Sequence, residues 1–85
     1  FKFYQNFPNP FNPVTSINFD ISTKTEVKLI ICNSLGQTVE KIDFGFQNAG
    51  AYNYKWKASN IPSGIYFCKI IAGDSFAVIK MILLK

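Results

Sequence analysis

The sequence predicts an all-β fold, a seven-stranded antiparallel β-sandwich of the immunoglobulin (fibronectin III-like) type. Short segments in which apolar and polar residues alternate recur at a spacing of roughly 8–12 residues. Clusters of Gly, Asn, Ser and Pro separate them, and no stretch shows the periodicity of a helix. Many short strands joined by such turns are typical of a two-sheet sandwich.

The length and composition indicate one small folded domain. The chain has 85 residues, of which 48% are hydrophobic and 16% aromatic, which suits a modest core and not a disordered segment. We expect a single domain over residues 1–85, with a proline-rich strap at 1–13 and the sandwich at 14–85. Because the chain starts with Phe1 and not with methionine, we expect a piece of a longer protein. No uninterrupted apolar run exceeds four residues, so no transmembrane segment is predicted.

The stretch Asn6–Pro13 is the most unusual part of the chain. Its three prolines each fix one φ angle and remove one backbone donor. Each also biases the preceding residue toward extended geometry. We therefore expect a stiff, extended strap close to polyproline II, lying at a sheet edge and pinned by Phe7 and Phe11.

Seven strands are expected. The alternation is clearest in the fifth strand, at 52–57. A continuous apolar run marks the sixth strand, at 65–71, as central. A break in the pattern at Ile42 marks the fourth strand, at 39–44, as a bulged edge strand. The strand segments are 1–7, 15–21, 27–32, 39–44, 52–57, 65–71 and 76–84, and the turns are 22–25, 33–37, 47–50, 60–64 and 73–74.

The residue inventory argues against an enzyme and against a nucleic-acid reader. The net charge of +4 rests on nine lysines scattered along the chain, with no arginine, so we interpret them as a solvated strand face and keep a basic binding surface as the alternative. There is no histidine, the five carboxylates form no close pair, and no nucleophile elbow, phosphate loop or metal-ligand spacing occurs. We expect no catalysis, no cofactor and no metal.

Cys32 and Cys68 allow two interpretations. Tyr66 precedes Cys68 by two residues, which resembles the tyrosine corner beside the second disulfide cysteine of immunoglobulin domains. The alternation, however, places Cys32 on the face opposite Leu29, whereas Cys68 shares a face with Tyr66 and Ile70 and points inward. We favour two unpaired thiols, with Cys68 as a small buried hydrophobe, and keep the disulfide as the alternative.

The aromatic row Tyr52, Tyr54 and Trp56 also has two interpretations. It alternates with Asn53, Lys55 and Lys57, as the buried face of a strand does. The same spacing would suit an aromatic platform for sugar. We favour the core.

Several motifs occur in an order that resembles a known family. Each is a weak signal alone, but together and in this order they are specific. The motifs are Asn9-Pro10-Phe11-Asn12-Pro13 with Thr15–Phe19, Val27–Ile31 leading into Asn33–Gln37, Ala49-Gly50 before Trp56, Pro62–Tyr66, and Lys80–Leu83. On these grounds the chain resembles the type A C-terminal sorting domains of the type IX secretion system, which are related to the flagellar-hook-capping immunoglobulin-like domains.

The resemblance implies a non-catalytic export address. Such a domain directs an extracellular cargo protein through the type IX secretion system to the cell surface, transiting the periplasm. The implied partners are the outer-membrane secretion translocon and the processing machinery, with no nucleic acid, and the domain itself is expected to be monomeric. The chain departs from the family at Cys32 and Cys68, where larger side chains are common, and these changes give no ground for a new activity.

A folded address needs rigid, exposed features. The strap, the Gly64 loop and the final strand are the best candidates, and an exposed final strand could pair with a partner by β-augmentation. For Gly36 and Tyr66 we favour turn formation and packing, and for the final strand recognition and packing both stay open. The recognition candidates are Asn9, Pro10, Phe11, Asn12, Pro13, Gly64, Tyr66, Lys80, Met81 and Lys85.

Two other functions stay open at this point. One is an accessory immunoglobulin-like module of a secreted enzyme that binds carbohydrate or protein. The other is a structural spacer domain. The first requires a solvent-facing aromatic patch, and the second requires no specific surface at all.

Overall fold

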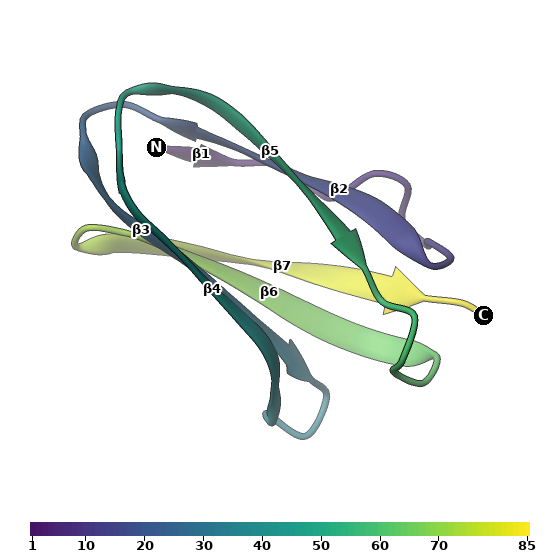
Figure 1. Cartoon of the computed structure of the whole chain (residues 1–85). Helices are drawn as coiled ribbons and strands as arrows, with labels where there is room; N and C mark the ends of the chain where they lie inside the picture. The colour runs from purple at the N-terminus through teal and green to yellow at the C-terminus, as the bar shows by residue number, and fades with distance from the viewer.

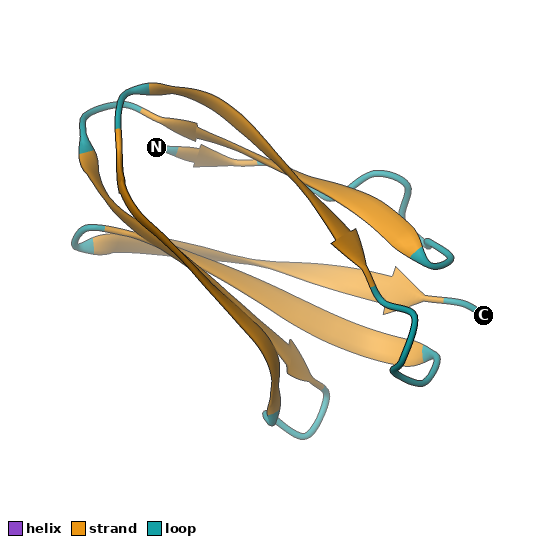
Figure 2. Cartoon of the chain, viewed as in Figure 1, coloured by secondary structure: helices purple, strands orange, loops and turns teal.

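The computed structural model describes all 85 residues as two packed antiparallel sheets without a helix (Figures 1 and 2). One sheet has the strand order β1-β2-β5 and the other the order β4-β3-β6-β7. The predicted all-β, seven-stranded sandwich is therefore confirmed. The strands are β1 (Lys2–Phe3), β2 (Val14–Ile21), β3 (Thr25–Asn33), β4 (Thr38–Gln47), β5 (Gly50–Lys57), β6 (Gly64–Ala72) and β7 (Ser75–Leu83).

The sandwich is elongated, with extents of 37 × 23 × 17 Å. The two termini lie at opposite ends of its long axis (Figure 1). Phe1 lies at the end that holds the β2–β3 and β6–β7 turns, and Lys85 lies at the other end beside the β5–β6 loop. The two ends of the molecule therefore carry different sets of loops.

Alternation places one face of each strand in the core. The buried residues of β2, β3 and β6 follow a period of two, as the sequence pattern predicts. They form two clusters, and Phe3 and Phe44 pack against both. The cluster near the C-terminal end of β7 includes Phe11, Ile17, Leu29, Trp56, Tyr66, Met81 and Leu83, and the smaller one includes Phe19, Ile21, Val27 and Ile70.

The positions of two strands within their sheet agree with the sequence pattern. β6 lies between β3 and β7, as its apolar run predicts, and β4 is an edge strand whose pairing with β3 shifts register twice. Gly73 and Asp74 form the turn of the β6–β7 hairpin. Gly73 has a φ of 59°, and a Cβ there would lie 2.6 Å from Thr25 Oγ1, so this position requires glycine.

Two expectations for the N-terminal segment are wrong. The opening strand spans only Lys2–Phe3, not residues 1–7, because the backbone pairing with β2 is interrupted after the bond from Tyr4 N–H to the carbonyl of Asn18 and resumes only at Phe7, which exchanges two bonds with Ser16. Nor is the strap polyproline II, because it bends at residues 8–10 and 12–13. The strap is instead a bent segment that touches β2 at Phe7 and β7 at Phe11.

Candidate functional site

The strap closes part of the outer edge of the last strand. Phe11 forms a parallel bridge with Leu83. Its N–H donates to the carbonyl of Ile82 at 2.9 Å, and its carbonyl accepts the N–H of Leu84 at 3.0 Å. The side-chain oxygen of Asn9 accepts the N–H of Ile82 at 2.8 Å. Segments from the two ends of the sequence thus form one continuous edge.

We call this region the terminal clasp. It consists of residues 7–13 of the strap, the C-terminal part of β7 with the two residues after it (80–85), and the β5–β6 loop (58–63). A backbone bond of 2.9 Å from Ala58 N–H to the carbonyl of Pro13 joins the loop to the strap. Lys85 joins the loop to the C-terminal residues, since its Nζ donates to the carbonyl of Ser59 at 2.8 Å and its N–H donates to Ser63 Oγ at 2.9 Å.

Phe11 alone anchors the strap in the core. Its side chain is 2% exposed and packs against Trp56 with ring centroids 5.7 Å apart. Phe7 is 77% exposed. The expectation that both phenylalanines pin the strap is therefore wrong for Phe7. The reason is that Phe7 follows the edge of β2, whereas Phe11 crosses to the other sheet over the core.

A buried polar network pins the start of the strap, a role that was expected of the Phe7 side chain. Asn6 and Thr15 are the two buried polar residues of the chain. Asn6 Nδ2 donates to Thr15 Oγ1 at 2.9 Å, and Thr15 Oγ1 donates to the carbonyl of Pro8 at 2.9 Å. No buried side-chain polar atom in the molecule lacks a hydrogen-bond partner. The strap is thus fixed by directional bonds at its start and by an aromatic ring in its middle.

Tyr66 connects the β5–β6 loop to the core. Its ring is buried against Trp56, with centroids 6.0 Å apart, and its hydroxyl donates to the carbonyl of Pro62 at 2.6 Å. A hydroxyl that bonds the backbone a few residues upstream is the geometry of a tyrosine corner. This geometry agrees with the packing role favoured for Tyr66 from the sequence.

All ten recognition candidates lie in the clasp or directly beside it, and they divide by exposure. Three have buried side chains and pack in the core, and two are half-buried. The remaining five present their surfaces to solvent. The buried ones are Phe11, Tyr66 and Met81, the half-buried ones are Asn9 and Pro13, and the exposed ones are Pro10, Asn12, Gly64, Lys80 and Lys85.

Sequence reasoning missed Asn6 and Thr15, which fix the strap. A signal for Thr15 was present, because it continues the inward-facing series of Ile17 and Phe19. A hydroxyl at an inward position requires a buried partner. No comparable signal marks Asn6, whose partner is nine residues away.

Glu40 was also missed. Its carboxylate, on β4, accepts bonds from Tyr54 Oη at 2.9 Å and from Trp56 Nε1 at 2.8 Å, both on β5, and so ties the two sheets together. Burial, the hydrogen bond to Glu40 and the charge of Glu40 raise the pKa of Tyr54. The row Tyr52, Tyr54 and Trp56 faces inward, which agrees with the core interpretation and leaves no aromatic platform there.

The cysteines are unpaired, as the alternation predicts. Cys68 is fully buried and Cys32 is half-exposed on the opposite face of the sheet. Burial, together with the nearby Cys32 thiol, raises the pKa of Cys68 to about 12. Cys68 is therefore a protonated, small apolar group at neutral pH.

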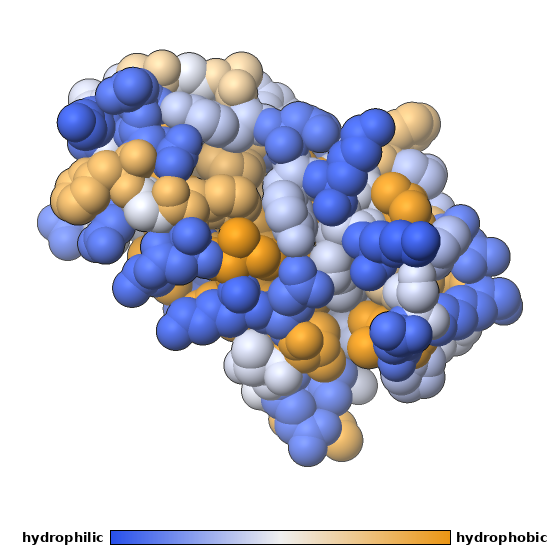
Figure 3. Space-filling view, viewed as in Figure 1, coloured by the Kyte–Doolittle hydropathy of each residue, from blue (hydrophilic) through white to orange (hydrophobic).

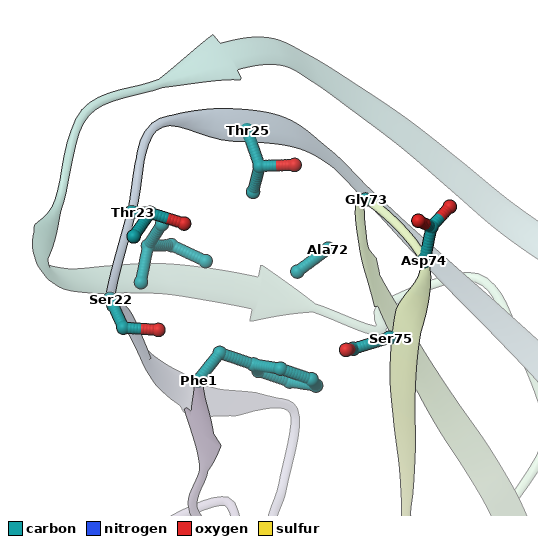
Figure 4. A pocket seen from close by; sticks show the side chains of 9 residues that line it. Phe1, Ser22, Thr23, Thr25, Ala72, Gly73, Asp74 and Ser75 are labelled. Atoms are coloured by element: carbon teal, nitrogen blue, oxygen red, sulfur yellow. The ribbon is translucent and has the colours of Figure 1, made fainter.

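The far end of the sandwich holds a polar hollow. A cavity of about 330 Å³ lies between the β2–β3 and β6–β7 turns, and hydroxyl side chains surround it beside the ring of Phe1 (Figure 4). No group of three or more Cys, Asp or Glu side chains converges there or elsewhere to hold a metal. The hollow lies at the opposite end from the clasp.

The molecular surface is mixed. Hydrophilic side chains cover much of the face in Figure 3, and apolar patches interrupt them. Several large apolar side chains are at least half exposed, among them Leu35, Phe46, Phe76 and Val78. No helix of the structure is long and apolar enough to cross a membrane.

The comparisons with known proteins identify one family. No curated protein and no solved structure gives a significant match. Residues 5–85 match the family model described as the secretion system C-terminal sorting domain. Domains of this family are sorting signals for type IX secretion and are in general not catalytic. Such a signal implies a secreted or cell-surface protein that is recognised by secretion machinery. The chain therefore belongs to the family of secretion system C-terminal sorting domains.

Proposed function

We propose that this domain is a non-catalytic, monomeric export address. The outer-membrane translocon and the processing machinery of the type IX system are its partners, and the cargo transits the periplasm on its way to the cell surface. The observation that carries this proposal is the terminal clasp. Asn9 and Ile82, which are 73 residues apart in sequence, are joined by a hydrogen bond along the outer edge of β7, so the surface that a receptor would contact exists only in the folded domain.

A folded address has a physical advantage over a linear one. Its exposed groups are held at fixed positions by the core, so a receptor loses less conformational freedom when it binds. In the clasp, Phe11, Tyr66 and Met81 supply that core. The exposed groups that the receptor contacts are then Pro10, Asn12, Lys80 and Lys85.

The first test fuses residues 1–85 to an exported reporter in a host with type IX machinery. Protease-accessible reporter on intact cells is the measurement. We expect surface reporter with the domain and none without it. A reporter that stays inside the cell with a folded domain attached would contradict the proposal.

A matched pair of charge reversals tests the clasp. Lys80→Glu with Lys85→Glu changes exposed charges in the clasp, and Lys24→Glu with Lys41→Glu makes the same change in charge at exposed positions elsewhere. We expect the first pair to reduce surface reporter and the second pair to leave it close to the wild type. Equal effects of the two pairs would remove the clasp from the proposal. The alternatives of an accessory binding module and a spacer have no specific observation in their favour, because the aromatic row is internal.

A further inference from the structure

The edge of β7 has an unoccupied half. In β7 the odd-numbered residues exchange backbone bonds with β6, and the even-numbered residues point their N–H and C=O groups away from the sheet. The strap and the side chain of Asn9 use the groups of Ile82. Gln5 Nε2 donates to the carbonyl of Lys80 at 2.7 Å. The outward groups of Phe76 and Val78, and the N–H of Lys80, have no such partner.

We call this unoccupied part the open ledge: the outward backbone groups of Phe76, Val78 and Lys80. β1 approaches β7, but it belongs to the other sheet and makes its backbone bonds with β2, so the ledge has no backbone partner. The neighbouring side chains are apolar and accessible, since Phe76 is 63% exposed and Val78 is 50% exposed.

The other two long edges of the sandwich are protected. β4 carries two register shifts, a Gly45 with a φ of 70° and the exposed charges of Lys41 and Asp43. β5 presents Asn53, Lys55 and Lys57 to solvent. Bulges and charges of this kind discourage pairing with another chain. The ledge has no bulge, and its one charge, Lys80, lies at its end, so it is the most regular and apolar of the three edges.

The positive charges beside the open ledge indicate which kind of segment would pair with it. Lys69 is directly opposite Val78 on β6, and its Nζ lies 4.5 Å from the centroid of the Phe76 ring. Lys80 follows at the end of the ledge. The only carboxylate of the β6–β7 hairpin is Asp74, in its turn. An added strand would therefore meet apolar groups and two cations on the outer face of the sheet.

We infer that the open ledge binds an extended segment of a partner protein by β-augmentation, and that the side chains of this segment are apolar opposite Phe76 and Val78 and acidic near Lys80. This inference rests on the proposed function, in which the partner belongs to the secretion machinery. Five outward backbone groups correspond to a segment of about four or five residues, because alternate residues of a strand bond to the same neighbour. A second copy of this chain is the poorer occupant, since it would bring Lys69 and Lys80 of both copies together.

The test uses proline to block backbone pairing while the fold is kept. Val78→Pro removes an outward N–H that β6 does not use, and proline is tolerated at such edge positions. Lys55→Pro is the matched control, because the N–H of Lys55 points outward from β5 in the same way. In the reporter fusion we expect Val78→Pro to reduce surface reporter by about tenfold, which corresponds to the loss of one or two interfacial hydrogen bonds. We expect Lys55→Pro to leave it unchanged.

A second pair of variants keeps the backbone and tests the charge. Val78→Lys and Val78→Glu are equally polar, but only the glutamate repels an acidic segment. We expect more surface reporter with Val78→Lys than with Val78→Glu, and the reverse order would overturn the acidic partner. This comparison stays valid if Val78→Pro fails to fold.

The outcomes separate the two proposals. If the wild-type fusion does not reach the surface, the proposed function fails and this inference fails with it. If the wild type is exported and Val78→Pro is exported equally well, only the ledge inference fails. A purified domain that sediments as a dimer, and as a monomer after Val78→Pro, would replace the partner with a second copy. Binding to anionic phosphatidylglycerol vesicles that Val78→Glu abolishes would replace it with a membrane surface.

Discussion

The two halves of the outer edge of β7 differ in construction. From the carbonyl of Lys80 onward, Gln5 and the strap occupy the edge, and Met81 and Leu83 fill the core behind it. From Ser75 to Ile79 the edge carries no backbone partner, and the inward side chains of Ala77 and Ile79 are only half-buried. The difference predicts that one terminal strand is needed for folding along part of its length and is free to pair with a partner along the rest.

This comparison changes how a C-terminal truncation should be interpreted. The last six residues contain exposed candidates for recognition, Lys80 and Lys85, and also two fully buried side chains. Loss of export after their removal would therefore not distinguish a lost address from a lost fold. Point substitutions in each half of the β7 edge separate the two effects better than a truncation does.

The largest effect is expected for deletion of residues 80–85. It removes Met81 and Leu83, each worth about 2–5 kcal/mol when a buried side chain of this kind is truncated, from a domain whose total stability is expected to be about 5–15 kcal/mol. It also removes the partner of the strap. We expect no cooperative unfolding transition in urea when Trp56 fluorescence is followed. As a control, deletion of Leu84 and Lys85 alone should keep the transition, and a cooperative transition in the longer deletion would mean that the closed half is not structural.

The next effect separates the two phenylalanines of the strap. Phe11→Ala should reduce the free energy of unfolding by about 3–5 kcal/mol, because it leaves a cavity against Trp56. Phe7→Ala should change it by less than about 0.5 kcal/mol, because this side chain is mostly exposed. Urea denaturation of both variants gives the comparison. Similar losses in the two would show that the strap is pinned at both positions, as the sequence alone suggested.

Local pattern predicted the strands and failed at the strap for a physical reason. Ile17, Phe19 and Ile21 face inward because alternation is a property of the strand itself. Phe7 and Phe11 have the same side chain and similar neighbours, yet their burial is opposite, because a contact with Trp56, 45 residues from Phe11 in sequence, decides it. The bond between Asn9 and Ile82 spans 73 residues and has no local signature. The motifs of the clasp were thus visible in the sequence, whereas their meeting on the edge of β7 was not.

A smaller effect is expected where the strap leaves β2. Thr15→Val keeps the shape of the side chain but removes the hydroxyl that bonds Asn6 and the carbonyl of Pro8. We expect a loss of about 1–3 kcal/mol, the cost of leaving buried polar groups without a partner. Thr38→Val, at an exposed position of β4, is the control and should stay within about 0.5 kcal/mol. Equal urea midpoints for Thr15→Val and wild type would show that the network does not hold the strap.

At neutral pH the smallest effect concerns Cys68, which pairs with Ile79 at the boundary between the two halves. Below the ordinary thiol pKa of 9.0, Cys68 is protonated in the folded and the unfolded chain, and it adds nothing to the pH dependence of stability. Between 9.0 and about 12 the unfolded chain loses a proton that the folded chain retains. Stability must therefore fall as the pH rises through this window, and urea midpoints should fall more steeply for the wild type than for Cys68→Ala. The raised pKa of Tyr54 adds a slope of the same sign to both proteins and so cancels in the comparison. Parallel curves would mean that water reaches the thiol, and that β7 opens at Ile79 more readily than its closed half allows.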